Sequence, residues 1–139
     1  MPSLESVGDF FLENNERATF LNLPNLKYAG SCFMRHNTAI NEINMPNLTS
    51  VSSFFLNNNK GITKLNLPNL KWTGPGFMSL NEDIEEINLP SLKEVEEDFL
   101  CENKKTCKLD LPNLRKAGSY FMSSNEAIEE VNLPSLELA

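Results

Sequence analysis

The chain of 139 residues is 40% hydrophobic and 22% charged, a composition that suits one folded domain and argues against disorder. Its formal net charge of −7, from 12 basic and 19 acidic residues, argues against a nucleic-acid partner and against adsorption to anionic lipid. No run of about 18 apolar residues is present, so we expect no membrane insertion.

The first residues, Met1 to Glu5, lack a basic segment followed by an apolar one, so no secretory signal peptide is expected. We therefore expect a cytoplasmic protein if the chain is complete. If it is a fragment of a longer protein, we expect a cell-surface or extracellular location.

Prolines recur along the chain with a constant spacing of 22 residues. A fixed period of this length predicts a solenoid, in which each repeat packs only on its neighbours. We interpret residues 1–139 as a single repeat domain with six full repeats and a partial seventh. The full repeats begin at Pro2, Pro24, Pro46, Pro68, Pro90 and Pro112, and the partial one begins at Pro134.

Each repeat places the same residue types in the same order after its proline. A leucine comes first, and then small residues, including Gly8, Gly30, Gly74 and Gly118, which we expect to permit a tight turn. A phenylalanine and then an asparagine follow in all six repeats. We expect a buried phenylalanine column and asparagines that pair with loop backbone groups. The two series are Phe11, Phe33, Phe55, Phe77, Phe99 and Phe121, and Asn15, Asn37, Asn59, Asn81, Asn103 and Asn125.

The segment before each proline alternates between polar and apolar residues, as in Lys64-Leu65-Asn66-Leu67. A period of two predicts a short strand with one buried face, so stacked repeats form a parallel β-sheet with one strand per turn. Proline ends each strand because it has no N–H to donate. Outward amides in this segment are expected to bond to one another along the sheet. They are Asn22, Asn44, Asn66 and Asn88, with Asn132 at the end of the row and Asp110 before it.

A second period covers two repeats. Alternate repeats combine Val with Leu, as in Val7 and Leu12, and the others combine a smaller residue with Met, as in Ala29 and Met34. Volume compensation within one core layer explains this alternation, and so does descent from a duplicated 44-residue unit.

Two sets of outward residues are candidates for partner binding. The aromatic set is Tyr28 and Trp72, two turns apart, with Phe20 on the first strand. The charged set alternates in sign from strand to strand, which also predicts cross-strand ion pairs with a mainly structural role. Its members are Glu42, Lys64, Glu86 and Lys108, and the row continues to Glu130.

Three cysteines and a single histidine, His36, leave little material for metal or disulfide chemistry. We therefore expect no cofactor and no metal. A redox pair between Cys101 and Cys107 stays open as an alternative.

The repeat resembles the BspA-like leucine-rich repeats. The resemblance rests on the string aliphatic-x-x-Ile-x-Leu-Pro, then Leu-x-x-Val-Gly, then Phe-Leu-x-x-Asn, over nearly the whole chain. This repeat is one residue shorter than is usual in that family and has Asn where the family has Cys. The resemblance implies a leucine-rich-repeat right-handed solenoid with short helical or 3₁₀ turns opposite the sheet. It also implies a role in cell adhesion at a bacterial surface.

No nucleophile lies beside a base and no phosphate-binding glycine loop is present, so we expect no enzyme. We expect a non-catalytic protein-binding or adhesion module whose partner is a protein or a glycan. The alternative is a structural spacer or a segment that self-assembles end to end, because neither end carries a polar capping repeat. A chain without caps is also expected if it is a fragment of a longer array.

Overall fold

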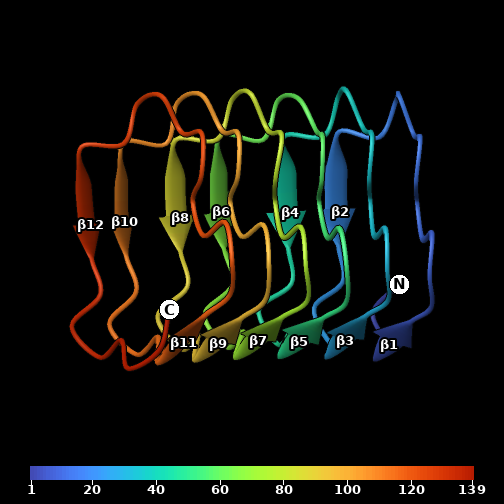
Figure 1. Ribbon diagram of the computed structural model, residues 1–139. Helices are drawn as coiled ribbons and strands as arrows, with labels where there is room; N and C mark the ends of the chain where they lie inside the picture. The colour runs from blue at the N-terminus through green and yellow to red at the C-terminus, as the bar shows by residue number, and fades with distance from the viewer.

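The computed structural model describes all residues from Met1 to Ala139 and shows a right-handed parallel β-solenoid of six turns (Figure 1). Each turn begins at its proline and contributes two strands. The first strands of successive turns form one continuous six-stranded parallel sheet. They are β1 (Ser6–Val7), β3 (Tyr28–Ala29), β5 (Ser50–Val51), β7 (Trp72–Thr73), β9 (Glu94–Val95) and β11 (Lys116–Ala117).

The second strands of the turns precede the prolines and lie where the alternating pattern predicts them. They are β2 (Phe20–Asn22), β4 (Glu42–Asn44), β6 (Lys64–Asn66), β8 (Glu86–Asn88), β10 (Lys108–Asp110) and β12 (Glu130–Asn132). Each turn therefore has two strands where we expected one, and the additional strand belongs to the six-stranded sheet. Its strands have only two residues each, too few for an alternating pattern to be visible in the sequence.

The turns that join the two strands differ from the short helical or 3₁₀ turns that we expected. Every second residue in them has a positive φ, as at Cys32 (57°), Met34 (51°) and His36 (57°). Their N–H groups bond alternately to the following and the preceding turn, for example to Ser53 at 2.8 Å and to Phe11 at 2.9 Å. A left-handed conformation costs about 1–2 kcal/mol per L-residue, so these bonds between turns must hold it in place.

The core of the solenoid is the predicted column of phenylalanines. Neighbouring rings stack with centroids 5.1–5.6 Å apart and planes within 12° of parallel. The four inner rings are completely buried, whereas Phe11 and Phe121 at the two ends are only partly buried. Buried leucines that follow the prolines, such as Leu26 and Leu70, pack beside this column.

The turns are grouped in pairs: one with two, three with four, and five with six. The second strands hydrogen-bond only within a pair, as β2–β4, β6–β8 and β10–β12, and wider gaps separate the pairs (Figure 1). The glycines of the even turns mark a further close contact within each pair. A Cβ at Gly30, Gly74 or Gly118 would come within 3 Å of the backbone of the preceding turn, so the role of these glycines is close approach and not a special turn conformation.

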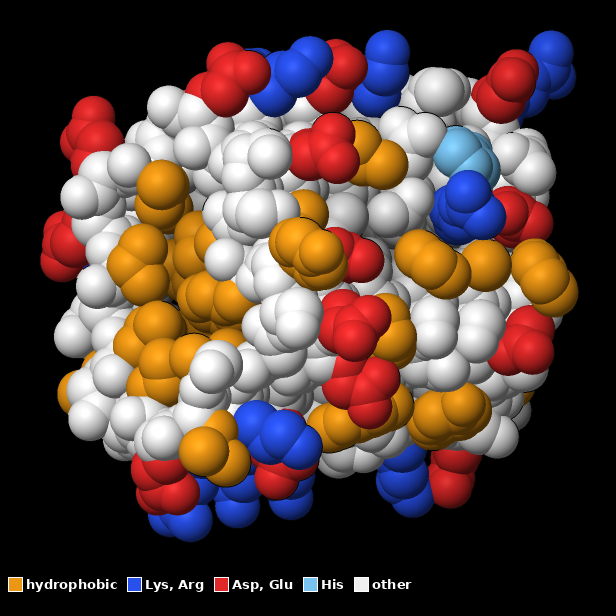
Figure 2. Space-filling view, viewed as in Figure 1, with side chains coloured by type: hydrophobic (Ala, Val, Ile, Leu, Met, Phe, Trp, Pro, Cys, Tyr) orange, Lys and Arg blue, Asp and Glu red, His pale blue; other side chains and the backbone are white.

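The C-terminal end of the solenoid is only partly covered. At the C-terminal end Val131 is 47% exposed, whereas its counterpart one turn earlier, Leu109, is fully buried. Hydrophobic side chains gather at this end in the space-filling view (Figure 2). Residues 134–138 cover part of it, where Lys116 forms a bridge with Leu138. No helix with the length and apolar character needed to cross a membrane occurs in the structure.

Candidate functional site

The seven candidate binding residues lie on two different faces. Tyr28 and Trp72 point outward from the six-stranded sheet, where the register aligns them through Ser50. Phe20, Glu42, Lys64, Glu86 and Lys108 lie on the second strands, so the structure does not bring the two sets together.

Three residues of the charged set, Lys64, Glu86 and Lys108, form ion pairs within the pairs of second strands. Lys64 Nζ lies 2.8 Å from Glu86 Oε1, and Lys108 Nζ lies 2.9 Å from Glu130 Oε2. These hydrogen bonds to carboxylates raise the pKa of both lysines above the ordinary value. The predicted cross-strand pairing is thus confirmed within pairs. Glu42 has no ion-pair partner, since a gap separates β4 from β6.

The outward amides follow the same rule. Asn44 Nδ2 donates to Asn22 Oδ1 at 2.9 Å, and Asn88 Nδ2 donates to Asn66 Oδ1 at 2.8 Å. Asn132 donates to Asp110 in the third pair. This row bonds internally, as predicted, and therefore has fewer free groups for a ligand.

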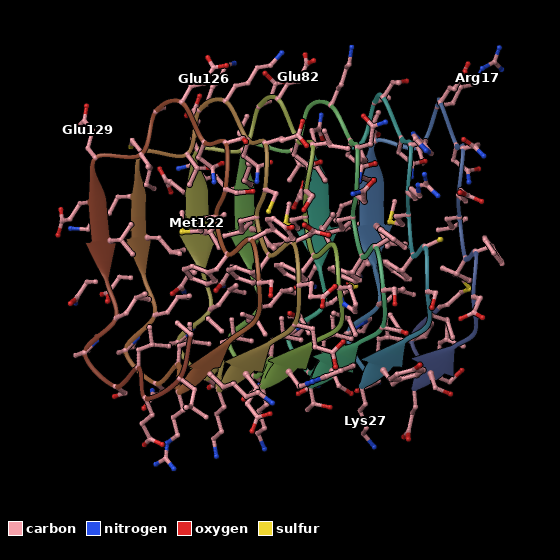
Figure 3. All side chains as sticks on the ribbon, viewed as in Figure 1. Arg17, Lys27, Glu82, Met122, Glu126 and Glu129 are labelled. Carbon is pink, nitrogen blue, oxygen red and sulfur yellow. The ribbon has the colours of Figure 1, made fainter.

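Long charged side chains border the molecule along two rims. Lys27 extends beyond the six-stranded sheet, whereas Arg17, Glu82 and Glu126 project from the loops at the opposite side (Figure 3). Met122, by contrast, is partly buried against the core.

The six-stranded sheet carries a hollow beside Trp72. The cavity has a volume of about 380 Å³ and is lined by Trp72, Glu94, Glu96, Glu97 and Lys116. The register places Glu94 directly between Trp72 and Lys116. One aromatic wall, three carboxylates and one ammonium group therefore face a single hollow, which makes its electrostatic character acidic.

Turns five and six approach each other closely beside the hollow. A Cβ at Gly118 would lie 2.6 Å from the carbonyl carbon of Glu96, so turn six approaches turn five too closely for a side chain. Pro75, Val95, Gly118 and Ser119 complete the lining. Glu96 and Glu97 stand where the other turns have glycine, serine, aspartate or proline, and that departure from the repeat was the sequence signal for this site.

Exposed aromatic residues on the turn segment were missed by reasoning from sequence. Phe10, Phe54 and Tyr120 are 62%, 42% and 70% exposed, although each directly precedes a phenylalanine of the buried column. Their positive φ values turn them outward. Arg35 lies over the Phe54 ring, 5.7 Å from its centroid, and Gly76 leaves room for that ring beside it.

All three cysteines are free thiols. Cys32 and Cys101 are buried and Cys107 is exposed. The structure contains no group of three or more His, Cys, Asp or Glu side chains that could hold a metal ion.

Comparison with known proteins found no matching family model, no matching curated protein and no matching solved structure.

Proposed function

We propose that this chain is a non-catalytic recognition module that binds a protein partner on its six-stranded sheet, with the hollow beside Trp72 as the main contact. The single observation that carries the proposal is the combination of an aromatic wall with Glu94, Glu96 and Glu97 around about 380 Å³. A cavity of this size lies in the range of ligand pockets.

The lining favours a basic side chain of the partner. A guanidinium or ammonium group gains from contact with an indole face and from nearby carboxylates. Lys116 at the edge of the hollow leaves the carboxylates in excess. Tyr28, two strands away and 41% exposed, extends the same surface and supplies a second aromatic contact.

The resemblance of the repeat to BspA-like leucine-rich repeats supports the same class of function. It favours a surface protein whose repeats adhere to other proteins, in which case the location is extracellular. A rigid sheet with variable outward residues is the usual binding surface of repeat proteins.

The test uses Trp72 as its own reporter, because it is the only tryptophan in the chain. A short arginine-rich peptide is expected to shift or quench its fluorescence in a saturable, salt-sensitive manner, and a glutamate-rich peptide of equal length is not. The variant in which Glu96 and Glu97 are both changed to Gln should weaken binding about tenfold or more. Replacement of Glu129 and Glu130 by Gln, away from the sheet, is the matched control.

A response to neutral oligosaccharide without any response to the arginine peptide would contradict this assignment. It would favour a glycan ligand stacked on Trp72.

A further inference from the structure

We propose that the two ends of the solenoid bind each other, so that copies of this 139-residue chain associate head to tail. The C-terminal end of one copy would bind the N-terminal end of a second copy. This association uses neither Trp72 nor the carboxylates of the hollow, although Lys116 of β11, which lines the hollow, also borders the proposed junction. Its test measures mass and not peptide binding, so the two proposals can fail separately.

The first observation is the apolar surface at the two ends. Phe121 and Phe11 each stack on one neighbour only, whereas every inner ring stacks on two, at 5.1–5.6 Å. Val131 is also 47% exposed at the C-terminal end, where hydrophobic side chains gather (Figure 2). An end-to-end contact would continue the phenylalanine column and remove both ends from water.

The second observation is that the unused hydrogen-bonding groups are complementary. At each internal junction the asparagine N–H donates to the Oδ1 of the next asparagine, as from Asn81 to Asn103 at 2.8 Å. Asn125 N–H has no acceptor at the C-terminal end, and Asn15 Oδ1 has no donor at the N-terminal end. The two ends therefore present the two halves of one more step of this ladder.

The backbone of the turns shows the same complementarity. In the internal pattern a leucine such as Leu100 donates its N–H to the oxygen of the preceding phenylalanine, Phe77, at 2.9 Å. The free groups that would repeat this bond between copies are the Leu12 N–H and the Phe121 oxygen. The second strands do not pair between turns two and three or between turns four and five. A junction between turn six of one copy and turn one of the next is of the same kind, so it needs no pairing of second strands.

The third observation concerns the segment that the second copy must displace. Pro134-Ser135-Leu136-Glu137 repeats Pro2-Ser3-Leu4-Glu5, and it occupies the place that β1 of a second copy would take beside β11. Ser3 can therefore replace Ser135, which bonds to the Pro112 oxygen at 2.7 Å. β1 of the second copy would add to the edge of the six-stranded sheet, as in strand addition.

The experiment measures mass by light scattering after size exclusion, from micromolar to millimolar concentrations of the full chain. The expected mass rises with concentration from 15.7 kDa toward multiples of it. Val131→Asp should hold the chain monomeric, and Leu80→Asp, at a lateral site of similar exposure (41%), should not. A constant monomer mass for the unaltered chain overturns the proposal, as does equal association of the Val131 variant.

The same substitution, Glu to Lys, at two equivalent repeat positions gives a second test of the head-to-tail association. Glu5→Lys would place a cation beside Arg115 of the other copy, and it would also break the ion pair of Glu5 with Lys27 at 2.9 Å next to the junction. It should weaken association roughly two- to fivefold, the range of an exposed ion pair. Glu137→Lys would instead repel Arg115 within its own chain, loosen the displaced segment and strengthen association. Changes in the same direction for both variants contradict the proposed displacement.

Discussion

The backbone N–H of Asn59 donates a hydrogen bond of 2.8 Å to the Oδ1 of Asn81, one turn further along the chain. The two side chains are otherwise used differently. Asn81 Nδ2 donates to the oxygens of Met78 and Leu56, whereas the buried Asn59 Nδ2 has no partner. Each asparagine of an even turn thus serves the carbonyls of its own turn and of the turn before it.

This difference predicts unequal costs for the same substitution. Asn81→Ala leaves three groups without partners, namely the Asn59 N–H and the Met78 and Leu56 oxygens. Asn59→Ala leaves only the Asn37 N–H unpaired and removes an unsatisfied amide. At about 1–3 kcal/mol per buried unpaired group, Asn81→Ala should be the more destabilising by at least about 2 kcal/mol. Urea denaturation of both variants measures this, and equal losses would contradict it.

The phenylalanine column predicts that an alanine substitution destabilises the fold more in the middle of the column than at its end. Phe77→Ala removes a fully buried ring between two stacked neighbours and should cost about 3–5 kcal/mol. Phe121→Ala removes a partly exposed ring with one stacked neighbour and should cost less than half as much. Free energies of unfolding compared at low protein concentration, where the ends are free, provide the check.

Gly30 and Gly8 occupy the same repeat position, but alanine should lower the stability of the fold at Gly30 and raise it at Gly8. A Cβ at Gly30 would lie 2.5 Å from the carbonyl carbon of Gly8, so the two turns would have to separate, at about 1–3 kcal/mol. At Gly8 a Cβ meets nothing within 4 Å, and alanine should stabilise by about 0.4–1 kcal/mol through the unfolded chain. Melting temperatures that fall for both variants would show that close approach is not the reason for glycine.

Asp83 predicts a dependence of stability on acid pH. Its hydrogen bond with Lys105 at 2.7 Å, and a second from the Gly61 N–H, hold the pKa of its carboxyl below the ordinary value of 3.8. A lowered pKa in the folded state adds stability above the unfolded pKa, and that stability is lost as the pH falls through the folded pKa. The melting temperature of Asp83→Asn should therefore lie below that of the unaltered chain at neutral pH. The difference should vanish at low pH, whereas Glu126→Gln, which has no ion pair, should show none.

The periodic part of this architecture was predictable from residue spacing alone. Leu65 and Phe77 lie in the core because their positions recur every 22 residues, and a solenoid must put equivalent residues in equivalent places. The left-handed turns were not predictable, since Met34 and Leu56 are residue types that avoid a positive φ and adopt it here only through bonds to neighbouring turns.

The candidate site was predictable in part. Trp72 could be placed on an outward position from the repeat, and the structure places it there. The hollow beside it was not predicted, although Glu96 and Glu97 depart from the repeat at two positions that line it. The split of the candidates between two faces was also hidden, because the strands of the six-stranded sheet are so short.

The pairing of turns also determines how the molecule should yield to a stretching force. Tension on the termini peels turns from an end, and the resistance at each junction depends on the bonds that cross it. The six-stranded sheet crosses every junction, but junctions within a pair also have the ladder between second strands and the hydrogen bonds between asparagine side chains. Extension should therefore proceed in abrupt steps of two turns, each releasing 44 residues, or roughly 150 Å of chain. A tether built this way would lengthen in large discrete increments under load while its remaining turns stay folded.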